Sequence, residues 1–192
     1  MPPRYRFRSF CILLSLALVA GCKFGDDTAD ANKMIEEAKA GILAGNKLSE
    51  EAYAKFRSFM NPETIENFPS NREQIRSAAQ ESADLYAKSA ATFRDQVVNK
   101  LEAASKLKIN EKFKEYITLK AEGFRKLAES KEVAKELSLT PLAPSLTTQD
   151  ALIAKAKEVD ARLNALVQQY EEAEQRANKV QQDNPDIIKS SQ

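Results

Sequence analysis

The sequence predicts an all-α protein: an antiparallel helical bundle of three long helices plus an N-terminal helical hairpin. The chain has 192 residues, which suits a single domain. Glycine (5 residues) and proline (7) are scarce, whereas the strong helix formers alanine, lysine, glutamate and leucine dominate. Apolar residues recur every three or four positions and never form the alternating runs that are typical of strands.

The hairpin is expected over residues 29–60. Its first helix starts near Thr28 or Asp30 and runs to Ala44, since Gly45-Asn46 is typical of a helix C-terminus. Ser49 can cap a second helix. The apolar face of the first helix consists of Ala31, Ile35, Ala38 and Ile42. A single kinked helix is the alternative.

The next long helix is expected after one short helical turn. Asn61-Pro62 is a favourable helix start, and the turn ends before Phe68-Pro69. The segment Ser70-Asn71-Arg72-Glu73 has the capping-box pattern and opens a helix to about Lys108. Alanine and serine crowd the middle of this helix, so a neighbouring helix can approach closely there. Its apolar positions are Ile75, Ala79, Ser82, Tyr86, Ala90, Phe93, Val97, Leu101 and Ala104.

A third helix is expected from Asn110, as the cap, to about Ser138. Gly123 lies inside it and costs about 1 kcal/mol relative to alanine. We interpret this glycine as the mark of a close helix contact. The apolar positions of the helix are Phe113, Ile117, Phe124, Leu127, Ala134 and Leu137.

The last helix follows a Pro-containing loop over residues 139–149 and ends at Asn184-Pro185. Thr147 or Thr148 caps it. Its apolar positions alternate steps of four and three, the seven-residue repeat of coiled coils. One interpretation is an interaction seam for a partner or a second copy, formed by Leu152, Val159, Leu163, Leu166 and Tyr170. The alternative, which we favour, is a seam that faces the chain's own bundle.

The composition argues against an enzyme. The chain has no histidine, the commonest general base and metal ligand, and no glycine-rich phosphate loop. Many acidic residues stand four positions from a lysine or arginine, as on solvated helix faces. We therefore expect no catalytic residues, no metal site and no cofactor.

Aromatic residues offer a second interpretation, an apolar ligand pocket between the helices. At helical spacing such residues are more often ordinary core, and the sequence does not separate the two roles. The residues concerned are Phe56, Phe59, Tyr86, Phe93, Phe113, Tyr116, Phe124 and Tyr170.

The N-terminal segment has the features of a bacterial signal peptide. Arg4, Arg6 and Arg8 precede residues 10–20, an apolar run of eleven residues interrupted only by Ser15. A membrane-spanning helix needs roughly 20 residues, so this run is too short to cross a bilayer. The alternative is a buried N-terminal helix or strand in which a Gly-Cys pair occurs by chance.

The ending Val19-Ala20-Gly21-Cys22 resembles the lipobox of prokaryotic membrane lipoproteins. The resemblance implies cleavage between Gly21 and Cys22 and attachment of lipid to Cys22. Lys23 follows where an aspartate in that family favours the inner membrane, so the resemblance implies the outer membrane, facing the periplasm, in a Gram-negative host. The domains are then a signal peptide (1–21), a lipidated tether (22–28), a bundle (29–184) and a flexible tail (185–192).

The processed chain is nearly neutral. The first 21 residues hold three of the 29 basic residues and none of the 28 acidic ones, which leaves a net charge of about −2. A nucleic-acid-binding surface would be one-sidedly basic, so we expect no nucleic-acid partner. The predicted protein is a non-enzymatic lipoprotein of the cell envelope with a structural or protein-interaction role. Its expected partners are the membrane and an unidentified envelope protein, and its oligomeric state stays open.

Overall fold

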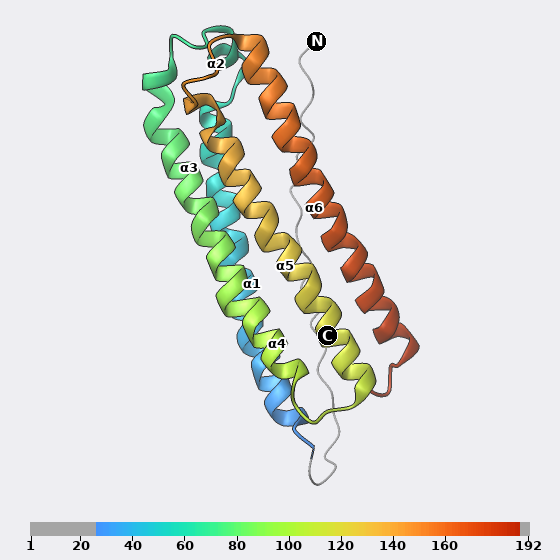
Figure 1. Ribbon diagram of the computed structural model, residues 1–192. Helices are drawn as coiled ribbons and strands as arrows, with labels where there is room; N and C mark the ends of the chain where they lie inside the picture. Colours follow the sequence, from blue (N-terminus) through green and yellow to red (C-terminus); the bar gives the residue numbers. More distant parts are fainter. Residues whose placement is uncertain (1–25, 189–192) are drawn as a thin grey trace.

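The computed structural model describes residues 26–188, which are helical throughout apart from short connections and contain no strand. Four long rods lie side by side and alternate in direction (Figure 1). They are α1, a rod formed by α3, η1 and α4 in succession, α5, and α6. The all-α prediction is confirmed. The elements are α1 (Thr28–Phe59), α2 (Pro62–Glu66), α3 (Arg72–Thr92), the π-helix η1 (Phe93–Val98), α4 (Asn99–Ser105), α5 (Glu111–Leu139), the 3₁₀-helix η2 (Thr140–Leu142) and α6 (Gln149–Asp183).

The predicted N-terminal hairpin is wrong, because α1 is one helix of 32 residues. Gly45 lies inside this helix and does not end it. A single heptad pattern runs through the helix without a change of phase, so every core position stays on one face. The positions are Thr28, Ala31, Ile35, Ala38, Ile42, Gly45, Ser49, Ala52, Phe56 and Phe59, and all are buried or half-buried.

Two glycines of α1 allow the rod opposite to approach closely. A β-carbon on Gly45 would lie 2.9 Å from two ring atoms of Phe93, closer than real contacts allow. A β-carbon on Gly41 would lie 2.8 Å from Cβ of Gln96 and 3.2 Å from its carbonyl oxygen. Both contacts are made with η1. Gly45 is therefore a packing residue, which explains why a helix-stop interpretation of it fails.

The π-helix η1 interrupts the long helix that the sequence predicts as regular α-helix. The core residues Phe93, Val97 and Leu101 are two successive steps of four apart, where a heptad would give a four and a three. The wider turn of a π-helix takes up the additional residue, so all three side chains remain buried.

Three of the predicted caps form, and two do not, since Ser49 lies inside α1. Asn61, Asn110 and Thr148 each accept a hydrogen bond from the first turn of α2, α5 and α6. The capping box at Ser70 does not form. Asn71 is the residue before α3, and its amide instead donates to the Thr64 carbonyl at 2.8 Å, which ties α3 to α2.

Small polar residues bring α1, α3 and α5 together inside the core. Ser82 donates to the Ala52 carbonyl of α1 at 2.9 Å and lies 3.0 Å from the Ser138 hydroxyl of α5. Ser89 donates to the Gly45 carbonyl at 2.8 Å. Each buried hydroxyl thus has a partner, which avoids the cost of burying an unpaired polar group. The predicted close approach at the alanine- and serine-rich segment is confirmed.

Gly45→Ala tests the close approach of α1 to η1. Alanine has a better helix propensity by about 1 kcal/mol, but its β-carbon collides with the Phe93 ring, and overpacking costs typically 1–3 kcal/mol. We expect a lower free energy of unfolding, measured by urea denaturation.

Gly123→Ala is the matched control for that variant. A β-carbon on Gly123 would lie 3.4 Å from Ala173 and Tyr170, an ordinary contact distance. The helix-propensity gain should therefore dominate, and stability should stay equal or rise by up to about 1 kcal/mol. Equal effects of the two substitutions would contradict the close-approach explanation.

Candidate functional site

Gly21 and Cys22, the predicted cleavage and lipidation residues, lie outside the described residues. The fold begins soon after them. The Asp27 amide donates to the Lys108 carbonyl at 2.9 Å, and the Asp27 carboxylate accepts from the Lys108 amide at 2.9 Å. Thr28 is buried as the first residue of α1. The end of the predicted tether over residues 22–28 therefore belongs to the folded bundle.

The predicted interaction seam on α6 lies inside the molecule. Leu152 and Val159 are fully buried, and Leu163 and Tyr170 are at most 5% exposed. Leu166 is half-buried and packs against the same core. The seam is a bundle face, as in the alternative that we favour above. The chain's own helices cover Leu152, Val159, Leu163 and Tyr170, so these four side chains pack inside the bundle and are not presented at its surface.

Charged pairs link α6 to α5 on the surface of the bundle. Arg162 pairs with Glu136 at 2.9 Å and Arg176 with Glu122 at 3.4 Å, both on the surface. Gly123 faces Ala173 and Tyr170 of α6, but an added β-carbon would lie 3.4 Å from both, an ordinary contact distance, so the helix contact does not require this glycine as the sequence interpretation supposes.

One charged pair between these helices is buried. Lys120 donates to Glu174 at 2.7 Å, and the lysine side chain is only 3% exposed. The second carboxylate oxygen of Glu174 has no hydrogen-bond partner within the described part of the chain. A buried pair of this kind adds little net stability, but it penalises arrangements that separate its members. Sequence reasoning missed Lys120, although its spacing from Ile117 and Phe124 places it on the core face of α5.

The aromatic residues pack mainly against one another and against small residues. The rings of Phe93 and Phe124 stack at 6.2 Å between centroids, and Phe124 lies 5.9 Å from Tyr170. Phe56 and Phe59 meet edge to face at 5.5 Å at the other end of α1. With Gly45 beneath the Phe93 ring, this middle layer is filled by side chains.

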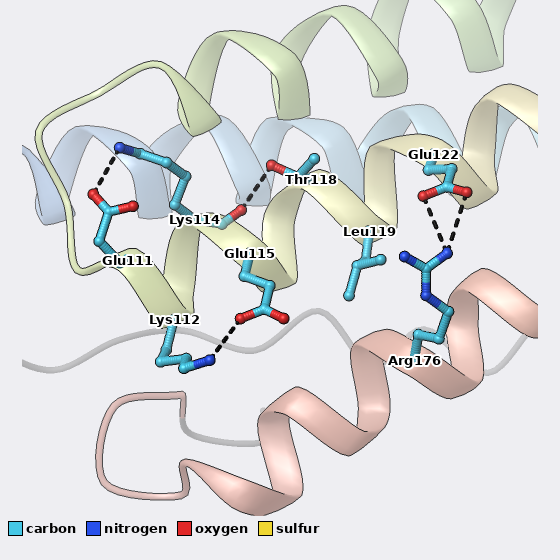
Figure 2. A pocket seen from close by; sticks show the side chains of 8 residues that line it. All are labelled: Glu111, Lys112, Lys114, Glu115, Thr118, Leu119, Glu122 and Arg176. Carbon is cyan, nitrogen blue, oxygen red and sulfur yellow. Dashed lines mark hydrogen bonds and ion pairs between the residues drawn. The ribbon is translucent and has the colours of Figure 1, made fainter.

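A shallow surface groove of about 470 Å³ lies between α5 and α6 (Figure 2). Its charges are paired with one another: Lys112 with Glu115, Lys114 with Glu111, and Arg176 with Glu122. The lining residues are Glu111, Lys112, Lys114, Glu115, Thr118, Leu119, Glu122 and Arg176. Paired charges of both signs leave no single charge to select a ligand.

A second groove, of about 480 Å³, lies where α5 turns into α6. Leu139, Ala143 and Leu146 give it a more apolar lining, to which lysines and glutamates also contribute. Arg72 reaches from α3 into this region, where its guanidinium donates to the carbonyls of Pro141 and Leu146. These bonds fix the loop that forms one wall of the groove.

Ion pairs on the surface of the bundle lower the pKa of several carboxylates. A hydrogen bond from Lys100 lowers the pKa of Glu37, and one from Lys55 lowers that of Glu81. Lys131 differs, because burial lowers its pKa to about 8. Within residues 26–188 no group of three or more acidic or cysteine side chains could hold a metal ion, and no helix is long and apolar enough to cross a membrane.

No protein-family profile, curated protein or solved structure matches this chain.

Leu163→Ala tests the placement of the α6 seam. Removing a buried leucine side chain costs about 2–5 kcal/mol, so the urea midpoint should fall clearly. The exposed Gln168→Ala on the same helix is the control and should leave the midpoint nearly unchanged. A Leu163→Ala protein that keeps its stability but changes its oligomeric state would contradict the interior placement.

Proposed function

We propose that this protein is a lipid-anchored, non-enzymatic lipoprotein of the bacterial cell envelope, with a structural or protein-interaction role. The observation that carries the proposal is the sequence Val19-Ala20-Gly21-Cys22 directly ahead of a folded bundle. Lipid attached at Cys22 would bind the bundle to a bilayer, with the signal peptide removed at Gly21. Lys23 favours the outer membrane in a Gram-negative host.

The short distance between anchor and bundle supports this proposal. Only Lys23, Phe24 and Gly25 separate Cys22 from the first described residue, Asp26. Two or three acyl chains on one cysteine bind a bilayer firmly, whereas a single chain binds marginally. A firm anchor and a short tether keep the bundle close to the bilayer. This arrangement suits a protein that acts at the membrane surface.

The side chains of the bundle support a structural or interaction role over catalysis. Charged residues on neighbouring helices pair with one another, as Lys100 does with Glu37 and Arg125 with Glu102. The carboxylates with a lowered pKa stay ionised at neutral pH, whereas a general acid needs a raised pKa. The packed aromatic layer around Phe124 likewise favours this role over an apolar ligand pocket.

Cys22→Ser tests the anchor. The variant should lose labelling by a palmitate analogue in growing bacteria, and it should accumulate as the uncleaved precursor, because the thiol is the acceptor for the lipid. The measurements are in-gel detection of the label and the mass of the purified chain.

Cys11→Ser is the matched control, since Cys11 lies in the segment that cleavage would remove. Its labelling and processing should equal those of the unaltered protein. Continued labelling of Cys22→Ser, or loss of labelling in Cys11→Ser alone, would refute the proposed lipidation of Cys22.

A further inference from the structure

We propose that the bundle stands upright on the bilayer, with one defined end resting on the lipid headgroups and the opposite end held far from them. This inference rests on the proposed lipid anchor and goes beyond it. We call the headgroup-facing end the base. It consists of the start of α1, residues 106–110 between α4 and α5, and residues 184–188 after α6.

The length of the tether keeps the base at the membrane. Asp26 lies four residues after Cys22, and a fully extended chain spans at most about 3.3–3.6 Å per residue. The anchor therefore cannot lie more than about 14 Å from the start of the fold. A lipidated cysteine at the bilayer surface therefore keeps the first described residue within about 14 Å of that surface.

Hydrogen bonds join the start of α1 to the rest of the base, so the short tether limits the distance of both from the anchor. The paired bonds between Asp27 and Lys108 join the start of α1 to the loop between α4 and α5. The Asp26 carboxylate accepts from the Thr28 amide at 2.6 Å and so fixes the entry of the chain into α1. The chain thus enters the bundle at a fixed point, because Asp26 and Asp27 are both hydrogen-bonded to residues of the base.

The end of α6 completes the base. The amides of Ile187 and Ile188 both donate to the Asn184 carbonyl, at 3.1 and 2.9 Å. Ile188 is only 1% exposed and belongs to the same core as α1 and α5. In the described part of the predicted flexible tail, residues 185–188, the apolar side chains of Ile187 and Ile188 therefore pack against the bundle, whereas Pro185 and Asp186 are exposed. Figure 1 shows the start of α1, the α4–α5 loop and the end of α6 together at the lower end of the molecule.

The exposed side chains of the base carry both signs of charge. Lys106 and Lys108 are exposed, and so are Asp26 and Asp186. A surface of mixed charge suits the zwitterionic headgroups of the bilayer that holds the anchor, and it does not require anionic lipid. With only three residues between Cys22 and Asp26, the occupant of this face is the lipid surface that holds the anchor.

The opposite end is carried far from the bilayer. Helix α6 has 35 residues, and at 1.5 Å per residue it spans about 52 Å. Its start, together with α2, η2 and the loop over residues 143–148, forms this far end, which we call the tip (Figure 1). An upright bundle presents the tip, with its second groove and the Arg72-bound loop, to partners about 50 Å above the membrane.

The orientation is testable with a thiol-reactive fluorophore on the lipidated, full-length protein in phosphatidylcholine vesicles. Cys22 would be blocked by lipid and Cys11 removed, so a single added cysteine is labelled selectively. Lys106→Cys places the label at the base and Ser145→Cys at the tip, and both residues are exposed. Lipid with a spin label on its headgroup serves as the quencher. We expect several-fold stronger quenching at residue 106 than at residue 145.

Equal quenching at the two positions, or stronger quenching at the tip, would overturn the upright orientation. Vesicle flotation and the mass of acylated Cys22, measured on the same samples, separate this result from failure of the anchor itself. Unacylated protein that does not float would overturn the proposed function and the orientation together. Acylated, floating protein with equal quenching would overturn the orientation alone.

A long flexible Gly/Ser insertion between Gly25 and Asp26 tests whether the short tether causes the upright orientation. We expect the insertion to reduce the difference in quenching between the two positions while flotation is retained. An unchanged difference would contradict the tether-based orientation.

Discussion

The close approach of α1 to the π-helix η1 is the contact on which the bundle depends. Gly41 and Gly45 remove two side chains from α1, and η1 widens the opposite rod so that Phe93 and Val97 can both reach the core. Each feature would be unfavourable alone, because glycine weakens a helix and a π-helix is rare. Together they allow α1 to continue through its middle without losing contact. The uninterrupted α1 then fixes where the chain enters the fold, beside Lys108.

Sequence reasoning succeeded where a local signal determines the structure. The caps at Asn61, Asn110 and Thr148, and the end of α6 at Asn184, follow from side chains that satisfy nearby backbone groups. It failed at Gly45, because the same residue can end a helix or admit a neighbouring ring, and only the partner helix decides between them. The unbroken heptad through Gly45 was the available signal, and it was overlooked in favour of the glycine.

The candidate sites also differ in whether a local sequence pattern or the packing of a distant helix determines them. The apolar stripe of α6 could be predicted from its spacing, but whether Leu163 faces its own bundle depends on where α5 packs. The buried pair of Lys120 and Glu174 joins residues 54 positions apart, so local patterns could not match them. Because α5 and the core occupy the apolar stripe of α6, the surfaces left for partners are the two ends and the charged outer faces. In the proposed arrangement, a short anchor places one end at the membrane and leaves the other end far from it.

Amide hydrogen exchange over α1 tests the continuous helix most directly. The amides of residues 45–49 should exchange as slowly as those of residues 35–38, because both segments lie inside one helix and on one core face. Slow exchange at residues 45–49 would support the account of Gly41, Gly45 and η1 as one packing unit. Exchange at residues 45–49 as fast as in the loop at residues 143–147 would indicate a turn, and would contradict it.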